Sequence, residues 1–456
     1  MKDYTAISRI YFIGIGGIGM SALAKYYLNK NALVSGYDKT VTNLTRQMEN
    51  DGINIHYEDD IELLDKNAQL VVYTPAVPKD HKELNYYLHN NYELIKRSAL
   101  LGEITKSSFN ICIAGTHGKT TISTMVAHIL RHSGFGCNAF LGGISVNYHT
   151  NFWNSDNNVS VVEADEYDRS FLQLSPDIAL ISAMDADHLD IYGTKENMEH
   201  SFVQFSGKLK EGGLLLTNYS LPAGKFSAAN RLRYSLQNNE ADVFADDIKL
   251  LNGAYEFNIK SKSWQLNNVK LNMGGMHNIE NAVAAIAIAN HLSIEPEKIK
   301  AAVDDFKGVK RRFEYIIKND KTVFIDDYAH HPEELKALIK SAKNLFPEMR
   351  CTIVFQPHLF SRTRDFANEF AEVLNLGDDV YLLPIYPARE LPIENVTSEI
   401  IADRMNEAKG ICCTKEQLLQ ILNHSKLHEH DLELVITAGA GDIDQLVQPI
   451  KGILLK

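Results

Sequence analysis

The sequence lacks the features of a membrane or secreted protein. No apolar segment approaches the roughly 20 residues that a bilayer-spanning helix needs. The apolar run near the start, IYFIGIGGIGM, is broken by glycines and has no basic region or cleavage site of a signal peptide. The five cysteines form no CxxC pair and no metal-binding spacing. We therefore expect a cytoplasmic protein without a membrane partner.

An excess of positive charge is also missing. The chain has 46 Lys and Arg against 58 Asp and Glu, a net charge of −12 at pH 7, which argues against non-specific binding to nucleic acid. No solenoid repeat or low-complexity tract interrupts it. The 456 residues are 45% hydrophobic and 23% charged, as in ordinary globular proteins. This length predicts about three domains.

The most informative stretch is FNICIAGTHGKTTISTMVAHIL, residues 109–130. It predicts a strand, a glycine-rich turn and a helix that opens at Lys119-Thr120-Thr121. Such a turn offers backbone N–H groups and one lysine to a polyphosphate, and a threonine hydroxyl to Mg²⁺. Two residues, instead of the usual four, separate the first glycine from Gly118-Lys119. An ordinary tight turn is the alternative.

A second phosphate-type turn lies near the start of the chain. Residues 9–38 predict a strand, the turn Gly14-x-Gly16-x-x-Gly19, a helix and a second strand that ends at Asp38. The acidic residue is placed where a ribose hydroxyl would be bound. This fingerprint indicates a diphosphate on a helix N-terminus more firmly than it indicates nicotinamide. An NAD-dependent oxidoreductase is one alternative, and glycines that serve only close packing are another.

Acidic residues follow two further predicted strands. Because carboxylates just past a strand, near a phosphate loop, are placed to face Mg²⁺, these residues predict a metal-phosphate site. Acidic surface turns are the alternative. The first group is Glu163, Asp165, Glu166 and Asp168, and the second is Asp185, Asp187, His188 and Asp190.

The remaining chain continues the α/β pattern with one interruption. Residues 240–272 alternate apolar and polar, which predicts inserted antiparallel strands. An alanine-rich helix follows over 274–292, with Asn278 and Asn281 near its start, where Asn278 could simply cap it. A third α/β series begins near residue 308. Its strand-to-helix turns carry histidines and arginines suited to carboxylate or phosphate: His330, His331, His358, Arg362 and Arg364.

Taken together, these stretches resemble the Mur ligase family. The matching segments are GIGGIGMSALA, AGTHGKTT, EADEYDRSF, DADHLDIYGT, GGMHNIENAVAA, GVKRRFE, DDYAHHP, FQPHLFSRTRDF and GAGDI. The short phosphate loop is that family's form. The resemblance implies an α/β fold of three domains: a Rossmann-like domain for the UDP-sugar (1–106), a central P-loop ATPase-like sheet with a small antiparallel insert (107–309), and a Rossmann-like amino-acid-binding and lid domain (310–456).

The resemblance also implies an activity. An ATP-dependent ligase would join L-alanine to the lactyl carboxylate of UDP-N-acetylmuramate through an acyl phosphate, with Mg²⁺ and with Mn²⁺ as a possible substitute. The third domain would close over the site and exclude water. The protein would work as a monomer or dimer in the cytoplasm.

Site residues follow from the resemblance position by position. The catalytic residues would be Lys119, Glu163 and His188, and the metal would be held by Thr120, Glu163 and His188. ATP would be bound by Gly115, Thr116, Gly118, Lys119, Thr120, Thr121, Asn278, Asn281, Arg312 and Asp327. The UDP-sugar would be bound by Gly14, Gly16, Gly17, Gly19, Met20, Ser21 and Asp38. The alanine carboxylate would be bound by His330 and Arg362.

Three positions depart from the family pattern. Leu359 stands where we expect arginine, Arg389 where we expect glycine, and Tyr167 where serine is common. With Tyr167, this segment also resembles that of another family member, which attaches a whole tripeptide to the same nucleotide. That activity is the second hypothesis, and DADHLDIYG favours alanine addition instead.

Overall fold

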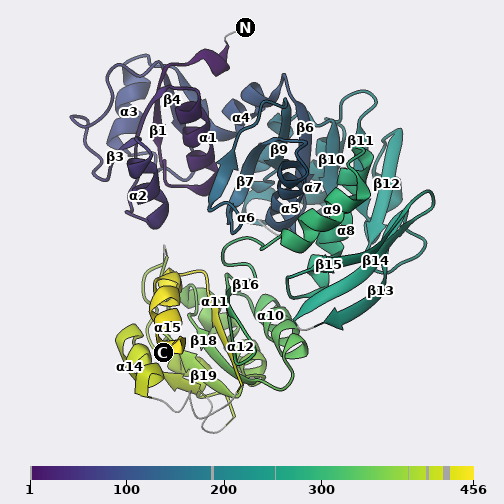
Figure 1. Ribbon diagram of the computed structural model, residues 1–456. Coiled ribbons are helices and arrows are strands. Elements are labelled where there is room, and N and C mark those ends of the chain that lie inside the picture. Colours follow the sequence, from purple (N-terminus) through teal and green to yellow (C-terminus); the bar gives the residue numbers. More distant parts are fainter. Residues whose placement is uncertain are drawn as a thin grey trace. The chain divides into compact units, whose positions relative to one another are not determined.

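The computed structural model describes residues 3–185, 189–251, 253–388, 390–406, 410–424 and 432–455. The chain packs into two compact units. One comprises the chain up to Asp246 with Asn258–Val269 and Glu280–Asp304, and the other comprises Asp247–Phe257, Lys270–Ile279 and the chain from Asp305 onward. Three sheets carry the fold (Figure 1), which is the predicted α/β architecture. The predicted domain boundaries stay a prediction.

The N-terminal sheet is parallel, with strand order β3-β2-β1-β4-β5. Its β1 and β4 read as near-continuous apolar runs because parallel strands are covered on both faces. The strands are β1 (Arg9–Ile13), β2 (Leu33–Tyr37), β3 (Asn54–His56), β4 (Leu70–Tyr73) and β5 (Leu94–Lys96), and the helices are α1 (Ile18–Asn29), α2 (Asn43–Asn50), α3 (Lys82–His89) and α4 (Arg97–Thr105).

The central sheet has the order β15-β14-β13-β12-β11-β10-β6-β9-β7-β8. The predicted insert is part of this sheet, because β13, β14 and β15 extend its edge. Its strands are β6 (Phe109–Ala114), β7 (Asn138–Ser145), β8 (Thr150–Trp153), β9 (Val159–Glu163), β10 (Ile178–Ile181), β11 (Leu214–Asn218), β12 (Asn230–Ser235), β13 (Val243–Leu251), β14 (Ala254–Ser261) and β15 (Gln265–Leu271). Its helices are α5 (Lys119–His132), α6 (Leu189–Tyr192), α7 (Lys195–Ser206), α8 (Met276–His291) and α9 (Pro296–Asp305).

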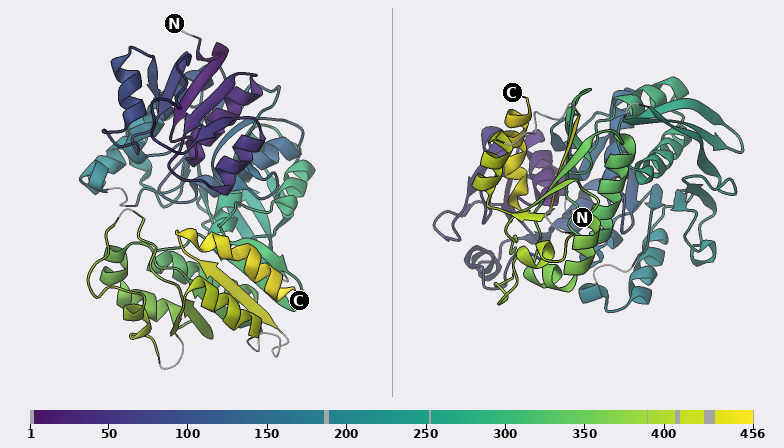
Figure 2. Two further views of the ribbon diagram at one scale, coloured as in Figure 1. Left: turned by 90° about the vertical axis from the view of Figure 1, so that its left-hand side faces the viewer. Right: turned by 90° about the horizontal axis from the view of Figure 1, so that it is seen from below.

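The C-terminal sheet has the order β16-β17-β21-β18-β19-β20, and only its edge strand β16 pairs antiparallel. Figure 2 shows α15 in yellow beside this sheet, where Ile450 packs with Phe324 and Val435 in one core cluster. The strands are β16 (Glu314–Lys318), β17 (Thr322–Asp327), β18 (Arg350–Phe355), β19 (Asp379–Leu382), β20 (Gly410–Cys412) and β21 (Glu433–Ala438). The helices are α10 (Pro332–Leu345), α11 (Phe360–Asp365), α12 (Ala367–Leu374), α13 (Glu399–Ala402), α14 (Lys415–His424) and α15 (Val447–Leu454).

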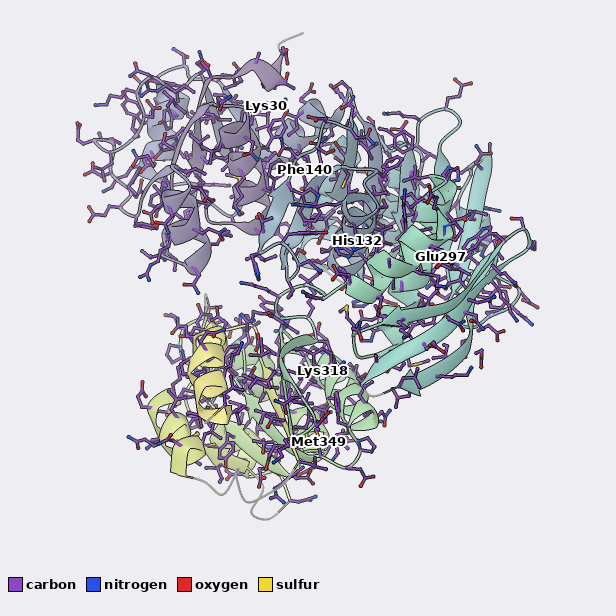
Figure 3. The ribbon with its side chains drawn as sticks, in the orientation of Figure 1. Lys30, His132, Phe140, Glu297, Lys318 and Met349 are labelled. Atoms are coloured by element: carbon purple, nitrogen blue, oxygen red, sulfur yellow. The ribbon has the colours of Figure 1, made fainter. Side chains whose placement is uncertain are left out.

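Helix α1 is tied to the edge of the central sheet. The buried Asn151 amide on β8 donates to Ile18 O at 2.6 Å and to Ser21 Oγ at 3.0 Å. Phe140, labelled in Figure 3, lies on β7 with its ring 5.8 Å from that of Tyr26 on α1. These two contacts hold α1, which follows the N-terminal glycine-rich turn, against the sheet that carries the phosphate loop.

Most of the cysteines are buried. Cys112 and Cys351 are fully buried in strands β6 and β18, and all five cysteines are free thiols. Within the described part of the chain, no helix combines the length and the apolar character that crossing a membrane requires.

Candidate functional site

The phosphate loop connects β6 to α5, as predicted. Gly115 and Gly118 both have positive φ, at 131° and 81°, a conformation that side chains rarely adopt. A Cβ added at Gly115 would lie 2.1 Å from Ser182 Oγ, and one at Gly118 would lie 2.8 Å from Asn281 Oδ1. The loop therefore requires both glycines, and Asn281 lies beside it.

Lys119 is the first residue of α5, and its ammonium group is held on two sides. Its Nζ donates to Gly115 O at 2.6 Å and to Glu166 Oε1 at 2.8 Å. Burial raises the pKa of Glu166, and the nearby Lys119 opposes that rise. This lysine thus lies across the phosphate loop, at the helix N-terminus where an anion is stabilised.

Thr120 and Glu163 form the second part of the site. The Thr120 hydroxyl donates to Glu163 Oε1 at 2.9 Å, and Gly142 N donates to Glu163 Oε2 at 2.9 Å. A hydroxyl and a carboxylate are hard oxygen ligands, and Mg²⁺ in phosphoryl-transfer sites uses one or two carboxylates together with substrate phosphates. The donors fit a divalent cation of that kind, although the described residues include no cluster of three His, Cys, Asp or Glu suited to a metal. His188 lies outside the described residues.

Gly142 on β7 leaves space for the Glu163 carboxylate. A Cβ at this position would lie 2.3 Å from Glu163 Oε1 and 2.4 Å from Oε2, so any side chain must displace the carboxylate. We expect Gly142→Ala to lower kcat by about 10- to 100-fold, because a displaced ligand costs this much. Steady-state kinetics with a metal titration would measure it. Gly224→Ala is the matched control, since its Cβ would meet nothing within 4 Å; equal activity of the two variants would contradict this role for Gly142.

The acidic residues after β9 do not act as one cluster. Only Glu163 faces Thr120. Asp165 lies 3.5 Å from Arg97 Nη2, and Asp168 lies 3.5 Å from Lys96 Nζ. With Glu166 beside Lys119, the structure thus divides the four predicted acidic residues among four different basic or hydroxyl partners.

The other predicted nucleotide residues have contacts of their own. Thr116 and Thr121 are buried, and Thr116 Oγ1 accepts a hydrogen bond from Asp185 N at 3.1 Å. Asp185 itself is exposed and lies 3.4 Å from His117 Nε2. Asn278 is buried at the start of α8 and donates to Gly274 O at 2.6 Å. That contact is structural, and a nucleotide contact by Asn278 stays a prediction.

The N-terminal turn is built around Asp38. Its Oδ2 accepts from Gly16 N at 2.7 Å and its Oδ1 accepts from Thr40 N at 3.0 Å, so the carboxylate holds the turn closed. Gly14 has φ of 86°, and Gly17 is the N-cap of α1. Met20 and Ser21 are buried in the first turns of that helix. A Cβ on Gly19 would lie 2.7 Å from Arg97 Nη1, so the third glycine makes room for an arginine.

In the C-terminal sheet, Asp327 forms hydrogen bonds with backbone N–H groups. Its carboxylate accepts from Phe313 N at 2.6 Å and from Ala329 N at 2.7 Å. Desolvation raises the pKa of Asp327 to about 6, against the effect of these two bonds. Arg312 is exposed. Its neighbour Arg311 instead donates to Gly439 O and Gly441 O and fixes the loop after β21.

His330, His358 and Arg362 lie together at the carboxyl ends of β17 and β18. The two imidazole rings are 5.7 Å apart, and Arg362 Nη1 lies 3.5 Å from His358 Nδ1. Burial, with the nearby His330 and Arg362, lowers the pKa of His358 to about 4. Burial also lowers the pKa of His330. Both imidazoles are therefore neutral at neutral pH, and Arg362 carries the positive charge.

The departure at Leu359 has a structural consequence. Leu359 is the residue before α11 and has φ of 70°, unusual for a branched side chain. Its N–H donates to Tyr386 O at 3.0 Å, and the Tyr386 ring stacks on His358 with 5.9 Å between centroids. Arg389 lies outside the described residues.

Several site residues have no signal of their own in the sequence. Arg97, Gly142, Ser123 and Tyr386 contact predicted site residues without belonging to a phosphate-loop or metal pattern; Ser123 Oγ, for example, donates to Glu163 Oε2 at 3.4 Å. Ser123 follows Thr120 by three residues on a helix, so helical spacing could have placed both on one face. The other three come from distant elements, the start of α4, strand β7 and the loop after β19.

Comparisons with known proteins agree along the whole chain. A model described as Mur ligase family, catalytic domain, matches residues 9–109, one for the Mur ligase middle domain matches 113–289, and one for the Mur ligase glutamate ligase domain matches 311–441. The chain is 47% identical to a UDP-N-acetylmuramate–L-alanine ligase of Cytophaga hutchinsonii, over 98% of this chain and 97% of that protein. It is 46% identical to the protein of that name from Phocaeicola vulgatus, over 100% of both.

Solved structures match as well. The crystal structure of UDP-N-acetylmuramate-alanine ligase from Thermotoga maritima has a TM-score of 0.85 and 26% identity, covering 98% of this chain and 99% of that one. A murein peptide ligase from Psychrobacter arcticus has a TM-score of 0.69 and 22% identity over 98% of both chains. The second match shows a shared fold alone.

Proposed function

The chain belongs to the Mur ligase family, and from this membership we infer that it is an ATP-dependent ligase that joins L-alanine to the lactyl carboxylate of UDP-N-acetylmuramate in peptidoglycan precursor synthesis. The supporting observation in the structure is Lys119 across the phosphate loop, beside the Thr120–Glu163 pair. The NAD-dependent alternative gives this site no role.

The reaction proceeds through an acyl phosphate. A carboxylate oxygen of the substrate attacks the γ-phosphorus of ATP, and ADP leaves. The alanine nitrogen then attacks the acyl carbon, phosphate leaves with the C–O bond electrons, and the nitrogen loses a proton to give the amide. Lys119 neutralises charge on the phosphates during the first step. Mg²⁺ or Mn²⁺, held by Thr120, Glu163 and His188, would supply further charge neutralisation.

The amino acid is assigned to the cluster in the C-terminal sheet. Arg362 holds the alanine carboxylate, because it carries the only fixed positive charge of the cluster. His330 Nδ1 lies 3.0 Å from Tyr328 O, so this nitrogen carries the ring proton. The neutral ring then presents Nε2 as a hydrogen-bond acceptor. An acceptor suits the alanine ammonium group better than the alanine carboxylate, which the family resemblance assigns to His330.

Substrate dependence tests the proposed function. Phosphate release should require ATP, a divalent metal, UDP-N-acetylmuramate and L-alanine together, in an assay that omits each in turn. The tripeptide of the recycling reaction is the comparison substrate. A far higher kcat/KM with the tripeptide than with L-alanine would contradict the proposal, as would saturable NADH binding without ATP turnover. The cytoplasmic location belongs to this proposal.

Replacing Arg362 by alanine should raise the KM for L-alanine by about 10- to 100-fold, because one charge-assisted hydrogen-bond partner is lost. The KM for ATP should change little. Arg364→Ala, on the same helix, is the matched control, since Arg364 pairs with Asp365 at 2.8 Å and is half exposed. A higher KM for alanine in both variants would indicate a general disturbance of α11 and not a carboxylate contact.

A further inference from the structure

Glu166 is the only acidic side chain that the described structure pairs with Lys119. Lys119 Nζ lies 2.8 Å from Glu166 Oε1, and the two side chains are 15% and 1% exposed. The remaining Glu166 oxygen, Oε2, is buried and has no hydrogen-bond partner among the described residues. Such a buried ion pair gives a fold little net stability, because apolar residues of similar size stabilise it as well or better.

The backbone around Glu166 is strained and is held by several contacts. Asp168 and Arg169 both have positive φ, at 51° and 54°, a strained conformation for side-chain-bearing residues that concentrates at functional sites. The Glu166 carbonyl accepts from Arg169 N at 2.9 Å and from Tyr192 Oη at 2.5 Å. The Arg169 guanidinium lies 5.1 Å from the centre of the Tyr192 ring. This sharp turn aims the Glu166 side chain inward.

Lys119 has three N–H donors, and two of them are occupied. Gly115 O and Glu166 Oε1 take one each, at 2.6 and 2.8 Å. Both partners are fixed, so the flexible lysine chain is held in one direction, and the third N–H, for which the described residues supply no partner, is available to a phosphate oxygen. A lysine–glutamate pair orients the phosphate-binding lysine of protein kinases in the same way.

We propose that Glu166 is a positioning residue, which holds Lys119 along the phosphate loop so that its ammonium group meets the phosphates of ATP. This inference rests on the proposed function, because it concerns phosphoryl transfer by Lys119. Glu166 contacts the lysine and needs no contact with ATP. The negative charge of Glu166 opposes binding of the negatively charged nucleotide, and the same charge orients Lys119.

The opposing effects give a test that separates positioning from folding. In Glu166→Gln the side-chain shape stays and the charge is lost. The kcat should fall by about tenfold or more, because Lys119 is no longer held in place. The Kd of MgATP, measured by calorimetry without UDP-sugar, should stay within about threefold of wild type or become tighter. Glu62→Gln is the control, because Glu62 pairs with Lys66 at 3.5 Å on the surface.

A second measurement uses stability alone. Lys119→Ala should lower Tm, because it leaves Glu166 buried without its cation, and Glu166→Gln added to it should restore most of that loss. The proposal would be overturned if kcat were unchanged in Glu166→Gln. It would also be overturned if ATP binding in that variant weakened in proportion to the losses of kcat and Tm. An unrestored Tm in the double variant would also overturn it. If wild-type enzyme failed to use L-alanine, the proposed function would fail, while the ATP-binding and Tm measurements would still decide the Lys119–Glu166 pair.

Discussion

Replacing Lys119 by alanine is expected to lower kcat by about 10²- to 10³-fold or more, since one preorganised charged donor contributes this much to a transition state. The lysine bridges Gly115 O and Glu166 Oε1 across the phosphate loop, and these two contacts fix its ammonium group there. Phosphate release with all substrates saturating measures the loss. A kcat within about threefold of wild type would contradict the role of Lys119.

Lost folding could imitate this result, and the double variant removes that ambiguity. Leaving Glu166 buried without a cation should cost about 3–5 kcal/mol of stability. Lys119→Ala combined with Glu166→Gln should regain stability without regaining activity. Circular dichroism melting and kinetics on the same preparations would show both effects.

The second large effect is expected at Glu163. Glu163→Gln keeps the size of the side chain and removes the charge that faces Thr120 and Gly142 N. We expect kcat to fall by about 100-fold, because metal-assisted charge stabilisation contributes several kcal/mol. The metal concentration for half-maximal rate should rise more than about tenfold. A metal titration of the rate measures both.

Glu62→Gln serves as the control here too, because it removes an exposed carboxylate that pairs with Lys66 on the surface. If Glu163→Gln kept the wild-type metal requirement while losing rate, the carboxylate would act on the phosphate loop and not as a metal ligand.

Local patterns predicted most of the fold and both glycine-rich turns. The turn at Gly115–Lys119 and the turn at Gly14–Gly19 lie between a strand and a helix as expected, because glycine spacing and apolar runs are properties of short stretches. Pro332 opens α10, a position that proline favours. The strands over 240–272 were also predicted, but their junction with the central sheet through β12 and β13 was not, since alternation within a strand does not specify its pairing partner.

The partners of the site residues could not be predicted in the same way. Asp38 was expected at a ribose, and its two oxygens hold Gly16 N and Thr40 N in the structure. Glu163 and Glu166 are three residues apart, and one faces a hydroxyl while the other faces a lysine. The sharp turn at Asp168 and Arg169 has no glycine to signal it. Such assignments depend on side-chain direction, which sequence spacing leaves open.

Oxygen transfer tests the central claim, phosphoryl transfer to a carboxylate, most directly. UDP-N-acetylmuramate would be labelled with ¹⁸O in both oxygens of its lactyl carboxylate and converted with ATP and L-alanine. Mass spectrometry of the released phosphate should show one ¹⁸O atom for each turnover, because the carboxylate oxygen that attacks phosphorus leaves with the phosphate. Phosphate free of ¹⁸O, formed together with the amide product, would contradict the acyl phosphate and the role that this account gives to the Lys119 loop.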